Sequence, residues 1–342
     1  MASLPDLTAA YVQPRAAWRV TLDGQDLTAA YAPRLRSLRL SEKLGEEADE
    51  LEIAVDDSDG LFAPPPQGAT ITVALGWDRG TPVAVGLVEK GSFTVDEVSW
   101  EGPPDTVTIT ARSADMKGTF RTRKTRTWVG ETVGAVIGKL AGDNALTPRC
   151  HPDLAGRAVG VAEQHNKSDM QFLRDLGRLH DATATVKGGA LIFAPRSAAT
   201  TATGKAMPAA TLTRSACESV SWRRASRDKD QDGAEAQWHD PEAGKRKTVA
   251  TGGERKKRLK GIYASEEDAR TAARSETSRL QRASATLEAS LAWGNPLLTP
   301  GTRIAAVGFR PHIDAQGWQI ASAEHTMDGS GLKTRVSMEV AI

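Results

Sequence analysis

An aspartate-rich turn at residues 56–60 (DDSDG) is the first segment whose residue types could do chemistry, because clustered carboxylates bind calcium. A calcium loop of the EF-hand type needs oxygen ligands at alternating positions, glycine at position six and glutamate at position twelve. With Gly60 at position six, position one is Val55 and position twelve is Pro66. The pattern fails at both ends, so we interpret the segment as a solvated turn.

Histidine and cysteine do not cluster in the sequence as metal ligands do. The two cysteines exclude a four-cysteine zinc site and a disulfide scaffold; we expect reduced thiols, with a single disulfide left open. None of the six histidines stands three or four residues from another His or Cys, so we expect no zinc. We interpret His165, before a predicted helix, as a polar loop or capping residue rather than a catalytic base. These residues are Cys150, Cys217, His151, His165, His180, His239, His312 and His325.

The sequence contains no Gly-x-Ser-x-Gly motif, no phosphate-binding loop and no dinucleotide fingerprint. Spacing of Asp and Glu alone leaves a glycosidase dyad open. Residues 128–133 (WVGETV) resemble a LysM peptidoglycan-binding motif over one short segment, which a packed structural helix explains equally well. We therefore predict no catalytic, cofactor-binding or metal site. A peptidoglycan hydrolase and a cell-wall-binding module stay as alternative functions.

Two basic clusters lie at residues 121–126 (RTRKTR) and 245–260, the second with eight Lys or Arg. They could contact DNA or the lumen or rim of a tube; the alternative is a solvated loop beside Asp and Glu. Only a few aromatic residues, such as Trp222 and Trp238, interleave with them, so stacking on a single strand has little support. Over 342 residues, 44 Lys+Arg against 43 Asp+Glu give a net charge of +1, which excludes capture of DNA or a membrane by the whole molecule.

The composition is that of a globular protein, with 39% hydrophobic and 25% charged residues. No apolar run approaches the roughly 18 residues that a membrane span needs. The amino-terminal residues lack a basic region followed by an apolar segment, so we expect a soluble protein without a secretory signal.

The elements that must position these residues begin with strands. Alternation of apolar and polar residues predicts an all-β domain over residues 15–113, because a period of two sends side chains to opposite faces of a sheet. Turn-forming residues separate the strands, as in a sandwich or barrel. The predicted strands are residues 18–22, 38–40, 51–55, 71–75, 83–85, 93–95 and 107–109.

The period then changes to that of helices. Val133, Val136, Ile137 and Leu140 share one helical face in the segment 131–140. Ser168 and Gln171 fit a capping box that starts a second helix, which ends near residues 180–181. Strands at 182–187 and 190–193 flank Gly188-Gly189, a hairpin signature. Residues 114–200 therefore look like a small α+β domain, and residues 197–211 like a linker.

The last third returns to strands after one long helix. Ser265 and Asp268 cap a helix that we predict over residues 265–283, packed against the following sheet. We divide the chain into a first β-barrel domain (1–114), an α+β domain with its linker (115–211) and a second β-barrel domain (212–342). The predicted strands after the helix are residues 286–293, 302–307, 318–325 and 332–340.

Four elements of the first third recur in the same order in the last third. Each third has an alternating strand with a Leu-Glu pair, then a unit of Pro, Gly, strand, Gly and aromatic residue, then two further strands. The alternative is that all β-meanders look alike, but the Pro/Gly unit is not generic. We therefore predict two copies of one β-barrel. The matched segments are 48–55 with 285–291, 66–77 with 300–309, 91–95 with 317–320, and 106–111 with 334–339.

At these residues the chain resembles the late control protein D family, the baseplate hub of contractile-tailed phages, which is related to the hubs of R-type pyocins and to the amino-terminal half of VgrG spikes. The resemblance covers nearly the whole chain and contains no catalytic signature. The segments that carry it are 91–98 (GSFTVDEV), 164–177 (QHNKSDMQFLRDLG), 262–270 (IYASEEDAR), 300–309 and 325–338.

The resemblance implies a mainly β fold with an α+β insert, in which two tube-like barrels and a small α/β domain assemble into a homotrimer with a pseudo-six-fold ring. Such a ring would join a six-fold tail tube to a three-fold central spike. VgrG proteins continue into a β-helical spike and this sequence stops at Ile342, so a separate spike protein is expected.

Further expectations follow from the resemblance. The partners are the spike, the tube protein and other baseplate or tape-measure components, with DNA contact at most transient. Assembly takes place in the bacterial cytoplasm, before the hub enters a phage tail or tailocin. Strands 71–75 and 302–307 have almost no charge, so they are either open edges for neighbouring subunits or plain core strands.

Overall fold

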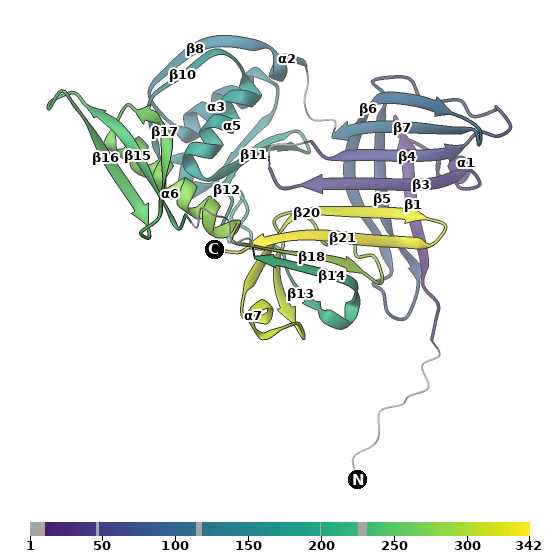
Figure 1. Cartoon of the computed structure of the whole chain (residues 1–342). Coiled ribbons are helices and arrows are strands. Elements are labelled where there is room, and N and C mark those ends of the chain that lie inside the picture. The colour runs from purple at the N-terminus through teal and green to yellow at the C-terminus, as the bar shows by residue number, and fades with distance from the viewer. Residues whose placement is uncertain (1–10, 46–47, 114–117, 199, 225–230) are drawn as a thin grey trace.

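The computed structural model describes residues 11–45, 48–113, 118–198, 200–224 and 231–342. It is built mainly from strands, with a helical part beside them (Figure 1). One sheet of 13 strands is formed by the first and last parts of the sequence, and three smaller sheets are formed by strands between residues 123 and 263.

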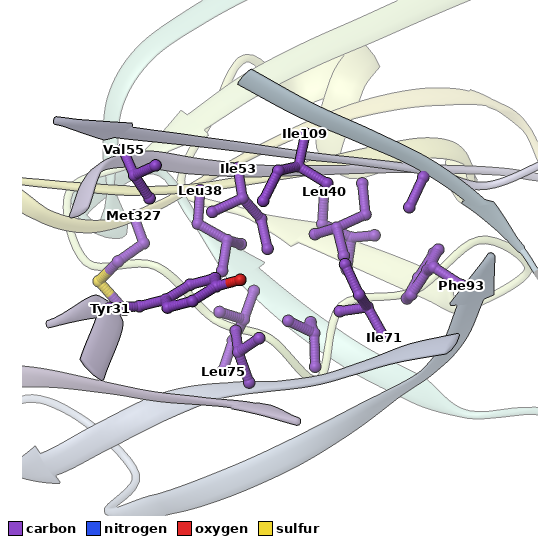
Figure 2. Close-up of a cluster of buried hydrophobic side chains, with 14 of the residues drawn as sticks. Tyr31, Leu38, Leu40, Ile53, Val55, Ile71, Leu75, Phe93, Ile109 and Met327 are labelled. Carbon is purple, nitrogen blue, oxygen red and sulfur yellow. The ribbon is translucent and has the colours of Figure 1, made fainter. Parts of the chain in front are cut away.

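The strands between Arg15 and Ser113 form the first β-repeat. Their inward side chains alternate with exposed ones, as in β4, and close around a core that includes Leu40, Ile53 and Ile109 (Figure 2). The elements are β1 (Arg15–Leu22), β2 (Gln25–Asp26), α1 (Thr28–Tyr31), β3 (Leu35–Lys43), β4 (Glu50–Asp56), β5 (Thr70–Arg79), β6 (Gly86–Glu101) and β7 (Thr106–Ser113).

The predicted strand at 83–85 is wrong. These residues lie in the connection between β5 and β6, directly after Pro82, which has no N–H to give to a sheet ladder.

The second β-repeat surrounds a separate core that includes Leu287, Ile304 and Trp318. Its elements are β13 (Ala209–Thr213), β14 (Cys217–Arg224), β18 (Ala285–Leu291), β19 (Arg303–Val307), α7 (Pro311–Asp314), β20 (Gly317–Asp328) and β21 (Gly331–Val340), with a 3-10 turn at Arg214–Ala216. Because β13 pairs with β19, the last residues of the predicted linker belong to this repeat.

The two repeats have the same strand order, which confirms the internal repeat. The first runs β3-β4-β7-β6-β5-β1 and the second β14-β18-β21-β20-β19-β13. One difference is that β1 is antiparallel to β5, whereas β13 is parallel to β19. Each repeat is a curved sheet around its own core, and β20 pairs with β3 to make the two repeats one sheet. Among the described strands, the pairing does not run back on itself to close a barrel within either repeat.

The α/β unit (residues 118–195) carries most of the helices and has its own core. Helices α3 and α5 match the predicted ones, and Ser168 caps α5 by accepting a hydrogen bond from the Gln171 N–H. The elements are α2 (Gly118–Arg121), β8 (Arg123–Thr132), α3 (Val133–Asp143), β9 (Thr147–Cys150), α4 (Pro152–Ala155), β10 (Ala158–Ser168), α5 (Asp169–His180), β11 (Ala182–Lys187) and β12 (Ala190–Pro195).

A small sheet interrupts the second β-repeat between β14 and β18. It consists of β15 (Gly233–Asp240), β16 (Lys245–Gly252) and β17 (Lys256–Tyr263), and helix α6 (Glu266–Arg282) covers it. The predicted helix is present, but the prediction that it packs on the second repeat is wrong for most of its length; its last residue reaches that repeat, with Arg282 Nε 3.6 Å from Glu339 Oε1 of β21. Its small side chains, such as Ala269 and Ala273, form a core with Ala234 and Ala236 of β15. The hydroxyl of Ser275 donates to the Arg178 carbonyl, which ties α6 to the end of α5.

Candidate functional site: the shared sheet and its ends

The seam between the two repeats joins strands that are about 280 residues apart in the sequence. Residues 37–43 of β3 pair antiparallel with residues 322–328 of β20. On the core side of the sheet, Leu38 lies opposite Met327 and Leu40 opposite His325, and all four side chains are buried. The seam is therefore a packed continuation of the core.

A buried ionic cluster lies beside this seam. Alternation in β3 puts Glu42 on the same inward face as Leu38 and Leu40, where a carboxylate must find partners. Lys90 of β6 supplies one, with Nζ donating to Glu42 Oε2 at 2.6 Å and to the Pro296 carbonyl at 2.8 Å. His325 of β20 places Nε2 3.3 Å from the same carboxylate oxygen. The cluster thus connects β3 and β6 of the first repeat to β20 of the second.

Burial and charge act in opposite directions on these groups. Burial alone raises the pKa of Glu42, but the adjacent His325 and the charge of Lys90 outweigh it and hold the pKa at about 2. Burial lowers the pKa of Lys90, and Glu42 counteracts this. Burial also lowers the pKa of His325, whose Nδ1 lies 2.9 Å from the Thr334 hydroxyl. We interpret the cluster as structural, because Lys90 is bonded to Glu42 and to the Pro296 carbonyl, and His325 Nδ1 is bonded to Thr334. His325 Nε2 faces the Glu42 carboxylate without a hydrogen bond of its own among the described residues.

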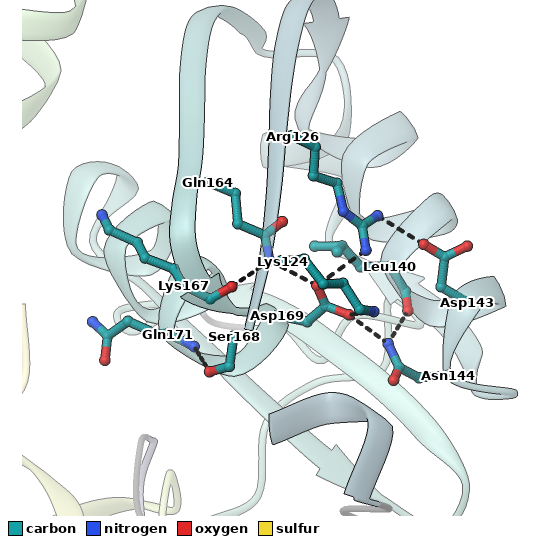
Figure 3. Close-up of polar contacts among 10 residues, drawn as sticks. All are labelled: Lys124, Arg126, Leu140, Asp143, Asn144, Gln164, Lys167, Ser168, Asp169 and Gln171. Carbon is teal, nitrogen blue, oxygen red and sulfur yellow. Dashed lines mark hydrogen bonds and ion pairs between the residues drawn. The ribbon is translucent and has the colours of Figure 1, made fainter. Parts of the chain in front are cut away.

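A second polar cluster orders the α/β unit (Figure 3). The fully buried carboxylate of Asp169, the first residue of α5, accepts hydrogen bonds from Lys124 at 2.6 Å, Gln164 at 2.8 Å and Asn144 at 3.0 Å. Arg126 adds a fourth at 3.2 Å. Burial raises the pKa of Asp169, but these bonds outweigh it and the pKa lies below its usual value. One carboxylate thereby holds together β8, β10, α3 and α5.

The basic clusters of the sequence are partly neutralised. Within residues 121–126, Lys124 and Arg126 face Asp169 and Asp143. In the 245–260 segment, Lys247, Lys257 and Arg258 form ion pairs with acidic side chains of the same small sheet and α6. This favours the interpretation of acid-paired surface strands, although Lys245 and Arg246 remain exposed on β16.

The aspartate-rich turn binds arginines. Arg36 pairs with Asp56 and Arg34 with Asp59, and the Arg34 guanidinium holds the pKa of Asp59 at about 2. The carboxylates are therefore used by the first repeat itself. Among the described residues, no group of three His, Cys, Asp or Glu side chains could hold a metal ion.

The other candidate residues are dispersed through the fold. Cys150 and Cys217 are free thiols, and burial raises the pKa of Cys150 to about 11. His151 caps α4, and His180 is buried at the end of α5. His165 is exposed within β10 and is neither the loop nor the capping residue that we expected, because Ser168 makes the cap. Trp128 of the LysM-like segment is buried and stacks on Phe172, which favours a packed structural role.

Sequence reasoning missed Glu42 and Lys90 as a pair. The available signal was a charged residue at the inward position of an alternating strand, two residues after Leu40. Their pairing across 48 positions depends on the tertiary fold.

The strands predicted as possible open edges are interior strands instead. β5 pairs with β1 and β6, and β19 pairs with β13 and β20. Both are therefore interior strands, as the core-strand alternative expected, and β5 is mostly buried. β19 buries only one face, since Ala305 and Val307 are exposed. In the stack of strands that Figure 1 shows from β6 to β14, these two strands lie at opposite ends, and the pairing continues from β6 through β5 and β1 to β2.

Comparisons with known proteins agree with this architecture. The family model described as phage tail baseplate hub (GPD) matches residues 42–331. The chain is 33% identical to the probable baseplate hub protein of Escherichia phage 186 and 32% to that of Escherichia phage P2, in each case over 95% of this chain and 93% of the relative.

Solved structures share the fold at low sequence identity. The 43 kDa tail protein of prophage MuSo2 from Shewanella oneidensis has a TM-score of 0.68 at 16% identity, covering 95% of this chain and 98% of its own. The tail protein from Neisseria meningitidis MC58 has a TM-score of 0.68 at 11% identity, covering 95% and 96%. The family match and the two phage relatives confirm the resemblance seen in the sequence, and the chain belongs to the phage tail baseplate hub (GPD) family.

Proposed function

We propose that this baseplate hub acts as a homotrimer whose six β-repeats form a ring between a six-fold tail tube and a three-fold central spike. The observation that carries the proposal is the same strand order in two repeats of one chain. A trimer of such chains has exact three-fold symmetry, and its six similar repeats approximate six-fold symmetry. One surface of the ring can then match each neighbour.

We also propose which components bind the hub and where it is assembled. The spike, the tube protein and other baseplate or tape-measure components bind the ring, and any contact with DNA is transient. The hub is assembled in the bacterial cytoplasm and becomes part of a contractile tail, either of a phage or of a tailocin. Capsid genes beside its gene would distinguish the two. We retain the three-part division at 1–114, 115–211 and 212–342, with residues 231–283 as an excursion from the third part.

Light scattering at micromolar concentration tests the trimer. The expected mass is three times the 36.4 kDa of the chain, measured with and without the spike protein. A monomer in the presence of both spike and tube proteins would contradict the proposal. An obligate ring should bury more than about 2,000 Å² per interface.

We further propose that the hub functions without catalysis. Lys, Arg, Asn and Gln side chains engage the carboxylates of Glu42, Asp169, Asp56 and Asp59. A zymogram of the purified protein should show no clearing of peptidoglycan, whereas clearing that disappears only when this chain is omitted would support the hydrolase alternative. A pull-down with isolated peptidoglycan tests the cell-wall-binding alternative.

A further inference from the structure

Two strand edges of the shared sheet, one in the second half of β6 and one along β14, correspond to the two strands of the seam. β20 pairs through residues 317–319 with β19 and through residues 322–328 with β3. β6 is built in the same way, since residues 86–94 pair with β5, while residues 97–101 pair with β7 on one side only in the described chain. β14, the counterpart of β3, pairs with β18 alone among the described strands.

A bulge fixes the correspondence of β6 and β20 residue by residue. The register of β6 against β7 shifts between Val95 and Glu97, and that of β20 against β21 shifts between Ile320 and Ser322. Val95 therefore corresponds to Ile320, and Trp100 to His325. The same backbone hydrogen bond precedes each bulge: Gly68 N–H to the Val95 carbonyl at 2.9 Å, and Gly301 N–H to the Ile320 carbonyl at 2.8 Å.

A second bulge fixes the residue-by-residue correspondence of β3 and β14. The register of β3 against β4 shifts between Leu35 and Ser37, and that of β14 against β18 between Cys217 and Ser219. Leu40 therefore corresponds to Trp222. The matching hydrogen bonds are Asp56 N–H to the Arg34 carbonyl at 2.7 Å and Ala292 N–H to the Ala216 carbonyl at 2.9 Å.

The residue pairing at the seam predicts which residues of β6 and β14 would lie opposite each other if these two strands paired. In the seam, Glu324 lies opposite Ser41, His325 opposite Leu40, and Thr326 opposite Arg39. We propose that residues 98–101 of β6 in one subunit pair antiparallel with residues 221–224 of β14 in a second copy of this chain. The register places Ser99 opposite Arg223, Trp100 opposite Trp222 and Glu101 opposite Ser221. This interface rests on the proposed trimer and specifies its contact.

Burial supports the transfer. In the seam, Leu40 and His325 are both 0% exposed, because each strand covers the other. At the free ends their counterparts lack that cover: Trp100 is 60% exposed and Trp222 only partly buried. Val98, two residues before Trp100, packs against the core of the first repeat, so Trp100 stands on the core side of the sheet. Pairing would bury two large aromatic side chains that are at present at the sheet edges.

Charge supports the same register. Ser99 shares a face with Glu97 and Glu101, so an arginine opposite Ser99 lies diagonally next to both carboxylates. Arg223 occupies that position. Within the part of the chain that the structure describes, Glu97, Glu101 and Arg223 make no ion pair. The seam already uses this kind of diagonal pair, since Arg39 Nε donates to Glu324 Oε2 at 2.9 Å.

The contact is head to tail, because β6 of one subunit meets β14 of the next. Such contacts form closed rings when the rotation between subunits closes. An unprotected strand edge on each end of a soluble protein is otherwise a site of aggregation, so a specific partner is the physical expectation for both.

Disulfide trapping tests the register. The variant Ser99→Cys/Arg223→Cys should form covalent dimers and trimers on mild oxidation, as resolved on a denaturing gel without reductant. Each single variant reports the background from the native cysteines. The control Ser99→Cys/Val220→Cys puts the second thiol out of register and on the opposite face, and should not cross-link above that background.

Charge reversal tests the pairing independently. Arg223→Glu should weaken trimerisation about ten-fold by placing three carboxylates together, and Glu101→Arg in the same chain should restore most of the loss. Arg246→Glu, in the exposed part of β16, is the matched control and should leave the trimer unchanged.

The outcomes separate this inference from the proposed trimer. A trimer by light scattering that shows no cross-link with Ser99→Cys/Arg223→Cys, or equal cross-linking in the out-of-register control, overturns the interface and leaves the trimer in place. A monomer in the presence of spike and tube proteins overturns both. A cross-linked trimer with rescue by charge exchange supports the interface.

Discussion

Replacing Lys90 with methionine should destabilise the protein more than the loss of any single exposed ion pair would. The side chains of Lys90 and Glu42 are only 1% and 6% exposed, and Lys90→Met leaves the Glu42 carboxylate buried beside His325 alone. Breaking a buried ion pair in this way typically costs about 3–5 kcal/mol, mostly because a charge stays buried without compensation. The Pro296 carbonyl also loses its donor, which adds to the cost.

Urea denaturation followed by tryptophan fluorescence measures this cost. Trp77 reports on the region directly, since its Nε1 donates to the Gly294 carbonyl across the two repeats at 2.8 Å. The matched control is Arg39→Met, which removes an exposed pair across the same seam and should cost less than about 1 kcal/mol. The double variant Lys90→Met/Glu42→Leu should be more stable than Lys90→Met, because no uncompensated carboxylate remains.

The cost of Lys90→Met should also depend on pH. Glu42 has its pKa lowered from 4.5 to about 2 in the folded protein, so the stability it contributes is complete above pH 4.5 and is lost as the pH falls toward 2. The difference between wild type and Lys90→Met should therefore shrink over that interval. If Lys90→Met costs no more than Arg39→Met at pH 7, or if the two changes of the double variant simply add, the cluster does not act as a coupled buried unit.

Three other perturbations have outcomes that the structure specifies. Burial lowers the pKa of His180 from 6.5 to about 4, so on acidification the unfolded state binds a proton before the folded state does. The free energy of unfolding should therefore fall by up to about 3 kcal/mol between pH 6.5 and 4. In denaturation experiments His180→Phe should flatten that pH profile. Asp169→Ala leaves four donors without their acceptor and should cost about 3–5 kcal/mol, with faster hydrogen exchange confined at first to α3 and α5; uniform exchange across the chain would contradict the assignment. Leu40→Ala in the core at the seam should lower the free energy of unfolding by about 2–5 kcal/mol, whereas Leu61→Ala at a 77% exposed position should change it little, and similar effects of the two would refute the seam as a packed core.

Local patterns predicted much of this fold because they act over a few residues. The N-cap at Ser168 and the Gly188-Gly189 turn are local devices, and both are present. The reciprocal half of the expected capping box is not made, because the Gln171 side chain donates to Asp175. The two glycines adopt positive φ angles of 57° and 70°, which suit a two-residue hairpin turn. The recurrence of the Pro/Gly-strand unit likewise predicted two repeats, which share one strand order.

Other elements were missed because their signals depend on distant partners. β8 is rich in charged residues and β10 alternates only weakly, and the two become strands by pairing with each other. The sequence did not predict the small sheet β15–β17 for the same reason. Helix α6 packs on this sheet, because the alanines of α6 and of β15 allow the two elements to approach closely.

The sequence by itself determined the repeat, the family and the alternation that builds both cores, since each of these is encoded in spacing along the chain. Only the tertiary structure decided which edges stay open. Absence of charge suggested strands 71–75 and 302–307, yet each of these has a neighbouring strand on both sides. Among the described strands, residues 97–101 of β6 and all of β14 have a neighbour on one side alone, and they carry Glu101 and Arg223. The sequence of an uncharged strand does not show whether its neighbouring strand belongs to the same chain or to another subunit. The order of strands in the whole sheet decides this, and that order is a property of the folded chain.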